Sequence, residues 1–199
     1  MWLATNAGSG VAFGAGEPST AGWTTIVAIQ AHGTDTTLSA WYKIASSEPS
    51  SYSFTNTFTG NQAYSYIMAA FSGVDGTTPL DGVTPVSENS TNTDTSPDIT
   101  ITTATNGAMV VFMLGSDPGV DPVVFSVTSP AGATAFTAVQ NGVTSWVSGV
   151  YYVQPTAGAT NIDTSTSSDA YTEAAISLRP ASGGGATPKP KSLGMMGLG

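Results

Sequence analysis

Short apolar segments with a two-residue period recur along the whole chain, and this pattern limits the possible folds most strongly. In the segment 38–44, Leu38, Ala40, Tyr42 and Ile44 would share one face of a strand. Turn-favouring Gly, Pro, Asn, Asp and Ser separate such segments, and none has helical periodicity over a dozen residues. We therefore predict an all-β protein, an antiparallel β-sandwich of the jelly-roll or immunoglobulin-like (Ig-like) kind. The expected strands are Met1–Gly8, Trp23–Gln30, Leu38–Ile44, Tyr52–Thr55, Ala63–Val74, Ile99–Thr103, Ala108–Leu114, Val123–Val127, Ala135–Val139, Trp146–Val153 and Ala170–Leu178.

Four short blocks recur in the same order and indicate an internal repeat. Ser19–Trp23, Val27–Gln30, Leu38–Tyr42 and Ala63–Ser65 are echoed by Ser129–Ala133, Thr137–Gln140, Val147–Tyr151 and Ala170–Thr172. The offset stays between 107 and 110 residues. We expect two pseudo-repeated halves, about 1–84 and 108–180, that form one sandwich or two small domains. One sandwich is favoured because the halves are short and no obvious linker separates them.

The start of the chain aligns with a strand of the second half, Met1–Gly8 with Ala108–Gly115. We expect the chain to begin inside a strand, without an export leader, and an upstream strand to be missing or supplied by a partner. The polar stretch Glu88–Asp98 is expected to be a surface connection between the halves.

Residues 181–199 differ in composition from the expected sandwich of residues 1–180. Ala181–Ala186 is a Gly-rich linker, Thr187–Lys191 is stiff and basic, and Ser192–Gly199 is small and apolar. This tail would have no fixed structure or, if ordered, would be held by a partner chain. The residues expected to anchor a partner are Lys189, Lys191, Leu193, Met195, Met196 and Leu198.

Charge and residue usage exclude several classes of protein. Lys and Arg total 4 against 13 Asp and Glu, a net charge of -9, which disfavours a nucleic-acid partner. The absence of cysteine and the single histidine, His32, exclude disulfides, thiolate zinc sites and multi-histidine metal sites. No apolar run approaches the roughly 20 residues that a membrane helix needs, so we expect no membrane partner. Polarity comes instead from 30 Thr and 24 Ser, which indicates a surface suited to contacts.

Groups suited to catalysis are few. The glutamates are Glu17, Glu48, Glu88 and Glu173. Glycoside hydrolysis needs two carboxyl groups in one cleft, but Glu48 precedes Pro49 at a turn, where we expect it to cap backbone or to pair with Lys43. His32 lacks the Gly-x-Ser-x-Gly motif of a nucleophile and is expected to be an ordinary loop residue. We therefore expect no enzyme, no catalytic residue and no cofactor.

Two kinds of ligand stay open as alternatives. Acidic pairs in three loops, Asp75 with Asp81, Asp94 with Asp98 and Asp117 with Asp121, offer oxygen ligands of the kind that suits calcium. Their spacing does not match an EF-hand, so no metal site is assigned. Aromatic residues that could stack on sugars are Trp23, Trp41, Trp146, Tyr42, Tyr151 and Tyr152. Most are expected in the core, including one of the adjacent pair Tyr151 and Tyr152, which must point to opposite faces.

Three motifs point to a family resemblance. Residues 40–54 read AWYKIASSEPSSYSF, residues 72–81 contain SGVD and PLD, and residues 175–180 read AISLRP. With Ala21-Gly22-Trp23, this pattern resembles a β-sandwich module that recurs in phage virion proteins and bacterial secreted proteins, and it covers about residues 1–180. The resemblance implies the fold and brings no catalytic residue. The chain departs from the module in lacking a leading strand and a leader peptide, which favours the virion context.

The expected function is that of a non-enzymatic phage virion structural protein, a capsid decoration or cement protein or a fibre component. It would be assembled in the host cytoplasm, and its partners would be its own copies, as a homo-oligomer, and other virion proteins. The alternative is a carbohydrate-binding or adhesive module of a secreted or cell-surface protein, located outside the cell, with a cell-surface glycan as partner.

Overall fold

The short period-two segments form strands in the computed structural model of the protein. The structure describes residues 2–6, 22–32, 36–48, 63–82, 85–89, 96–117, 119, 123–167, 171–182 and 188–195. Within these ranges the regular elements are all strands, so the all-β class is confirmed, and no helix there could cross a membrane. The strands are β1 (Trp2–Asn6), β2 (Thr24–His32), β3 (Thr36–Tyr42), β4 (Tyr64–Ser72), β5 (Val86–Asn89), β6 (Asp98–Thr103), β7 (Ala108–Ser116), β8 (Phe125–Ser129), β9 (Thr134–Ala135), β10 (Val139–Asn141), β11 (Ser145–Gln154), β12 (Gly158–Thr166), β13 (Tyr171–Leu178) and β14 (Lys189–Met195).

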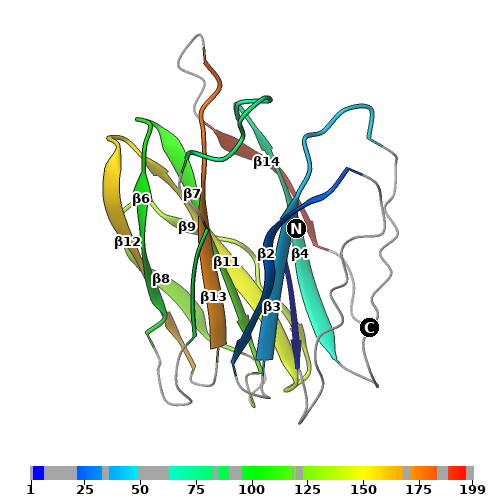
Figure 1. Ribbon diagram of the computed structural model, residues 1–199. Coiled ribbons are helices and arrows are strands. Elements are labelled where there is room, and N and C mark those ends of the chain that lie inside the picture. The colour runs from blue at the N-terminus through cyan, green and yellow to red at the C-terminus, as the bar shows by residue number, and fades with distance from the viewer. Residues whose placement is uncertain are drawn as a thin grey trace.

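These strands form three antiparallel sheets, which lie as layers in Figure 1. The first sheet has the order β14-β4-β1-β3-β2. The second, central sheet has the order β10-β11-β7-β13-β5, with β9 also paired to β11. The third sheet, β6-β12-β8, covers the other face of the central sheet. Sequence patterns had suggested one sandwich made from the two halves, and the third layer is an addition to that expectation.

The central sheet is buried on both faces, and β7 shows why. Met109, Val111 and Met113 pack toward the first sheet, in a core with Leu38 and Ile67. The alternate residues of β7 pack toward the third sheet, and these are Val110, Phe112 and Leu114. A strand that faces two apolar layers needs a continuous apolar run, which is what Ala108–Leu114 provides. In contrast, β6 alternates exposed and buried residues because it covers only one layer.

The SGVD, PLD and AISLRP motifs meet in space at one end of the central sheet. After β4 the chain turns at Gly73, whose φ of 73° favours glycine, and residues 74–81 then wrap around the end of β13. Backbone hydrogen bonds of 2.9 Å join Asp75 N–H to the Arg179 carbonyl and Asp81 N–H to the Ser177 carbonyl. The SGVD, PLD and AISLRP motifs therefore have a structural role in this fold.

Pairing around β1 and β7 follows one pattern in the two larger sheets. Trp2 of β1 lies opposite Ala40 of β3 and Ile67 of β4. Met113 of β7 lies opposite Gly149 of β11 and Ala174 of β13. The repeated blocks align Ala40 with Gly149 and, at the same offset as Ala63–Ser65, Ile67 with Ala174, so these pairings match Trp2 with Met113. The alignment of Met1–Gly8 with Ala108–Gly115 instead matches Trp2 with Met109. From Met113, β7 continues toward its N-terminal end as far as Ala108, whereas the described part of β1 begins at Trp2. This difference in length bears on the candidate site.

Several elements differ from the expectations. Strands β5, β12 and β14 were not anticipated. The segment Ala135–Val139, expected as one strand, is not one: Ala135 ends β9 and Val139 begins β10. Glu88–Asp98 is a surface connection only in part, since Glu88 belongs to β5 and Asp98 begins β6. His32 was expected in a loop but is the last residue of β2. The expected strand Tyr52–Thr55 lies outside the described residues.

Candidate functional site

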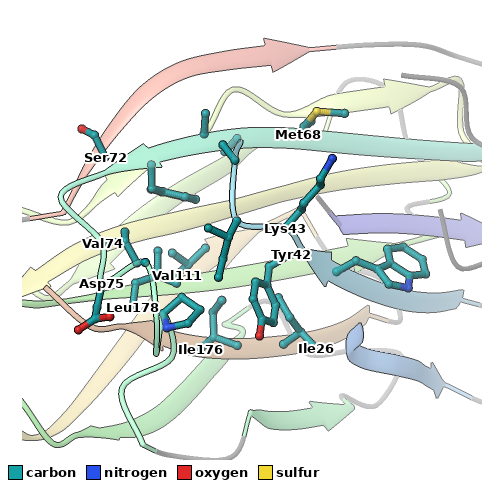
Figure 2. Close-up of a pocket in the computed structure, with 18 of the residues that line it drawn as sticks. Ile26, Tyr42, Lys43, Met68, Ser72, Val74, Asp75, Val111, Ile176 and Leu178 are labelled. Atoms are coloured by element: carbon teal, nitrogen blue, oxygen red, sulfur yellow. The ribbon is translucent and has the colours of Figure 1, made fainter. Parts of the chain in front are cut away.

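The main candidate site is a cavity of about 560 Å³ in the first sheet, between β3 and β4. Pairing of β1 with its two neighbours starts at Trp2, opposite Ala40 and Ile67. Beyond this level, β4 continues from Met68 to Ser72, and the chain continues past β3 from Lys43 to Ala45. In Figure 2, Met68 and Ser72 lie on one side of the cavity and Tyr42 and Lys43 on the other. We call this cavity the β3–β4 pocket.

Most of the pocket lining is apolar. Val111 and Met113 of β7 and Ile176 and Leu178 of β13 reach it from the central sheet, where they belong to the core between the sheets. The first sheet and its loops supply Trp23, Ile26, Trp41, Tyr42, Lys43, Ile44, Ala45, Glu48, Met68, Ala69, Ala70, Phe71, Ser72, Gly73, Val74, Asp75, Gly76 and Pro79. A cavity of this size and lining is in the range of binding sites for apolar groups.

Lys43 and Glu48 form an ion pair at the rim of the pocket. The Nζ of Lys43 donates to Oε2 of Glu48 at 2.9 Å, and Ser46 N–H donates to Oε1 at 2.7 Å. The hydrogen bond from Ser46, followed by that from Lys43, holds the pKa of Glu48 below its usual range. The expectation that Glu48 caps a turn and pairs with Lys43 is therefore confirmed. A carboxylate bound in this way stays ionised and stabilises the turn.

Asp75 lies at the same rim and closes a turn of its own. Its Oδ1 accepts hydrogen bonds from Thr77 N–H at 2.8 Å and from Thr78 N–H at 2.9 Å. These bonds, first that from Thr78, lower the pKa of Asp75. The rim of the pocket therefore carries carboxylates that are stabilised in their charged form.

Aromatic residues expected as sugar platforms occupy different positions. Trp41 is buried on the outer face of the first sheet, where Trp23, Tyr64 and Tyr66 pack against it. Burial, followed by the neighbouring Tyr64, raises the pKa of Tyr66. Of the six candidates, Trp23, Trp41 and Tyr42 line the pocket.

The remaining aromatic candidates belong to the cores between the sheets. Trp146 is buried in the core beside the third sheet, where Phe125 lies against it. Tyr151 packs toward the first sheet and Tyr152 toward the third. The two tyrosines point to opposite faces, as expected, and each is partly buried against one of the two cores.

Of the acidic pairs considered for calcium, only Asp75 with Asp81 lies wholly within the described residues. Asp81 is fully buried and accepts backbone hydrogen bonds from Ala104 and Thr105, so its carboxylate holds two segments of the fold together. Asp94 and Asp121 lie outside the described residues, as does Glu17. Within the described ranges, no three His, Cys, Asp or Glu residues are grouped to hold a metal ion. Glu88 and Glu173 lie opposite each other on β5 and β13, where Glu173 is buried.

The C-terminal tail forms strand β14, which pairs antiparallel with β4 of the same chain. Lys189 lies opposite Ser72, Leu193 opposite Ala69 and Met195 opposite Ile67. This intrachain pairing differs from the expectation that an ordered tail needs a second chain, because β4 offers a sheet edge within reach of the linker. Lys191 also belongs to β14, whereas Met196 and Leu198 lie outside the described residues. Partner anchoring by these side chains stays a prediction.

Comparisons of the chain with protein-family models, with curated proteins and with solved structures give no match. Function is therefore argued from the pocket and from β14. The sequence analysis did not identify the pocket. It did expect a strand upstream of Met1 to be missing or supplied by a partner, and the pocket lies beside the start of β1.

Proposed function

We propose that this protein is a non-enzymatic structural protein of a phage virion, a decoration or cement protein of the capsid or a component of a fibre. It acts through contacts with its own copies and with other virion proteins, and it is assembled in the host cytoplasm. The observation that carries the proposal is β14, a terminal strand that adds to the edge of β4 through backbone pairing. Addition of a strand to a sheet edge is a common way for chains to bind one another.

The chemistry of the carboxylates supports a role without catalysis. Glu48 is engaged by Lys43 and Ser46, and Asp75 by two backbone N–H groups. Asp81 is likewise held by backbone N–H groups. Carboxylates that stabilise turns in their ionised form are poorly suited to act as general acids at neutral pH.

Charge also supports assembly through the tail. Residues 1–179 carry 2 basic and 13 acidic residues, whereas residues 180–199 carry 2 basic and no acidic residue. A basic segment is attracted to the acidic surface of another copy, which favours encounter and orientation.

We further propose that the two larger sheets derive from a duplicated unit. The orders β14-β4-β1-β3-β2 and β5-β13-β7-β11-β10 correspond strand by strand. In this correspondence β5 follows β4 but pairs with β13, and β14 follows β13 but pairs with β4. Each half thus supplies the edge strand of the other half's sheet. The finer class, jelly-roll or immunoglobulin-like, stays a prediction.

One observation favours the alternative, a carbohydrate-binding or adhesive module located outside the cell. Trp23 and Tyr42 are half-buried and line the pocket, where aromatic faces could contact a sugar. The largely apolar lining offers few partners for sugar hydroxyls, so we rank this function second.

The assembly state of the full-length protein tests the proposal. Mass photometry should show oligomers for the whole chain and monomers for a variant that ends at Pro180. Monomers in both samples, together with binding to a glycan array, would overturn the structural role in favour of the alternative.

A further inference from the structure

We propose that the β3–β4 pocket is a strand-binding groove that accepts about four residues from the C-terminal segment Ser192–Leu198 of a second copy. The inserted segment would run antiparallel to β3 and β4, in line with β1. The inference rests on the proposed assembly function and names the surface and the segment that carry it.

The central sheet shows what occupies the corresponding position there. In the alignment of the repeated blocks Trp2 corresponds to Met113, and each lies between its two neighbouring strands. From Met113, β7 continues four residues further, to Met109, and pairs with β13 on one side and β11 on the other. The same four steps from Trp2 lead between Met68–Phe71 and Trp41–Ile44, and both of these segments line the pocket. The pocket is therefore the position of a strand.

The backbone at the sides of the pocket supports the same conclusion. In the described part of the chain, the pairing of β4 with β1 ends at Ile67, so no described strand pairs with this edge of β4 from Met68 onward. Such an edge presents N–H and C=O groups that bind an added strand. Four residues of strand span about 13 Å, which is the length over which the two edges face each other.

The lining of the pocket limits which side chains an inserted strand can carry. Val111 and Ile176 line it from the central sheet, and Trp23 and Met68 line it from the first sheet. Successive side chains of a strand point to opposite faces, so the occupant must be apolar or small on both faces. Residues 193–198, with the sequence LGMMGL, meet this requirement. Glycine leaves space in a narrow groove, and methionine adapts to irregular walls.

Charge fixes the direction of the occupant. A strand antiparallel to β4 enters the pocket at the end where Glu48 and Asp75 lie. The residues that precede the inserted segment include Lys189 and Lys191, whose ammonium groups would then meet these carboxylates. Lys43 is part of the same rim and already pairs with Glu48, which leaves Asp75 as the main partner for the incoming lysines.

The observed position of β14 explains why the occupant comes from a second copy. In its own chain this segment pairs with the outer edge of β4, against Ile67–Ser72, so it is compatible with an antiparallel strand at these residues. On that edge it has a partner strand on one side only. In the groove of another copy it would gain partners on both sides and apolar walls on both faces, which favours exchange between copies. The Gly-rich linker Ala181–Ala186 permits this change of position.

Cross-linking between single-cysteine variants tests the proposal, because the natural chain has no cysteine. One variant carries Ile44→Cys at the groove and the other carries Ser192→Cys in the tail. In one chain these positions are separated by β4, so mixing the two full-length variants under mild oxidation reports insertion into another copy. We expect disulfide-linked heterodimers in at least tenfold higher yield than with Val124→Cys, a control that is even more exposed (68% against 47%) and lies beside β8. Equal yields at Ile44 and Val124 would overturn the proposal.

A second variant fills the groove from within the chain. Replacing Met1 by Met-Val-Val-Phe gives Trp2 the residues that precede Met113 in β7. We expect the melting temperature to rise and the cross-link between the Ile44→Cys and Ser192→Cys variants to fall at least tenfold, whereas a polar Met-Ser-Asn-Ser extension leaves both unchanged. Persistence of the cross-link would overturn the proposal. Stabilisation without any tail cross-link in the parent variants would identify a groove for a different strand and overturn the second-copy assignment. Tail-dependent oligomers without a cross-link at Ile44 would likewise reject the groove, while leaving the proposed function intact.

Discussion

The carboxylate of Asp81 accepts the backbone N–H of Ala104 at 2.7 Å, and this bond joins the loop after β4 to the turn between β6 and β7. Asp81 is fully buried, it also accepts Thr105 N–H at 3.0 Å, and the Nε of Arg179 lies 3.7 Å from its Oδ1. A single side chain thus connects the loop, the turn before β7 and the residue after β13.

Removal of this carboxylate should destabilise the protein. Asp81→Ala leaves the N–H groups of Ala104 and Thr105, which are only partly buried, without their acceptor. We expect a loss of roughly 1–3 kcal/mol in the free energy of unfolding. Urea denaturation followed by tryptophan fluorescence measures the change. Asp98→Ala removes an exposed carboxylate as a control and should cost less than about 1 kcal/mol. Equal effects of the two substitutions would contradict this structural role.

Substitutions on the two faces of β7 should test the three-layer arrangement. Val110 packs toward the third sheet and Val111 toward the first, and both are buried. We expect Val110→Ala and Val111→Ala each to cost about 2 kcal/mol, because each removes buried methyl groups and leaves a cavity. The control Val124→Ala, at an exposed residue, should stay within about 0.5 kcal/mol. A near-zero effect at Val110 would mean that the third sheet does not cover β7.

Asp75 should make stability depend on pH in the acidic range. Its folded-state pKa lies below that of the unfolded chain, where an aspartate has a pKa of about 4. The resulting stability is present above the unfolded pKa and is lost as pH falls through the folded pKa. We expect the melting-temperature advantage of the natural protein over Asp75→Asn to shrink between about pH 5 and pH 2. A constant advantage across this range would show that the carboxylate does not titrate below its ordinary value.

Loss of β14 should expose the outer edge of β4. In a variant that ends at Pro180, we expect faster hydrogen exchange of amides in Ile67–Ser72, because their strand partner is gone. Exchange in Ala108–Ser116 serves as the internal control, since β7 pairs with β11 and β13 in both proteins. Unchanged exchange in β4 would contradict the pairing of β14 on that edge.

Much of the fold was predictable from local patterns. Period-two segments such as Leu38–Ile44 identified strands because a sheet buries alternate residues. The hydrogen bonds of Glu48 with Lys43 and with the backbone of its own turn were also predictable, since these groups lie close to Glu48 in the chain. Local signals suffice where the interacting groups are close in sequence.

Other features depended on distant parts of the chain. Strands β5 and β14 carry no clear alternation, because an edge strand is defined by the backbone groups that its neighbour presents. Asp81 was identified from the sequence only as an acidic loop residue, and its contacts with Ala104 and Thr105 come from the fold. Spacing also did not show that Asp75 binds its own turn while Asp81 binds the turn before β7, since spacing along a loop does not determine where its carboxylates point.

The sequence by itself determined the all-β class, the positions of most strands, the acidic body and the basic tail. These properties follow from side-chain periodicity and charge, which act over a few residues. Only the tertiary structure decided the three layers, the pairing of β14 with β4 and the pocket between β3 and β4. Those features arise because residues far apart in the chain compete for the same sheet edges and faces, and the outcome depends on which strands meet and in which register.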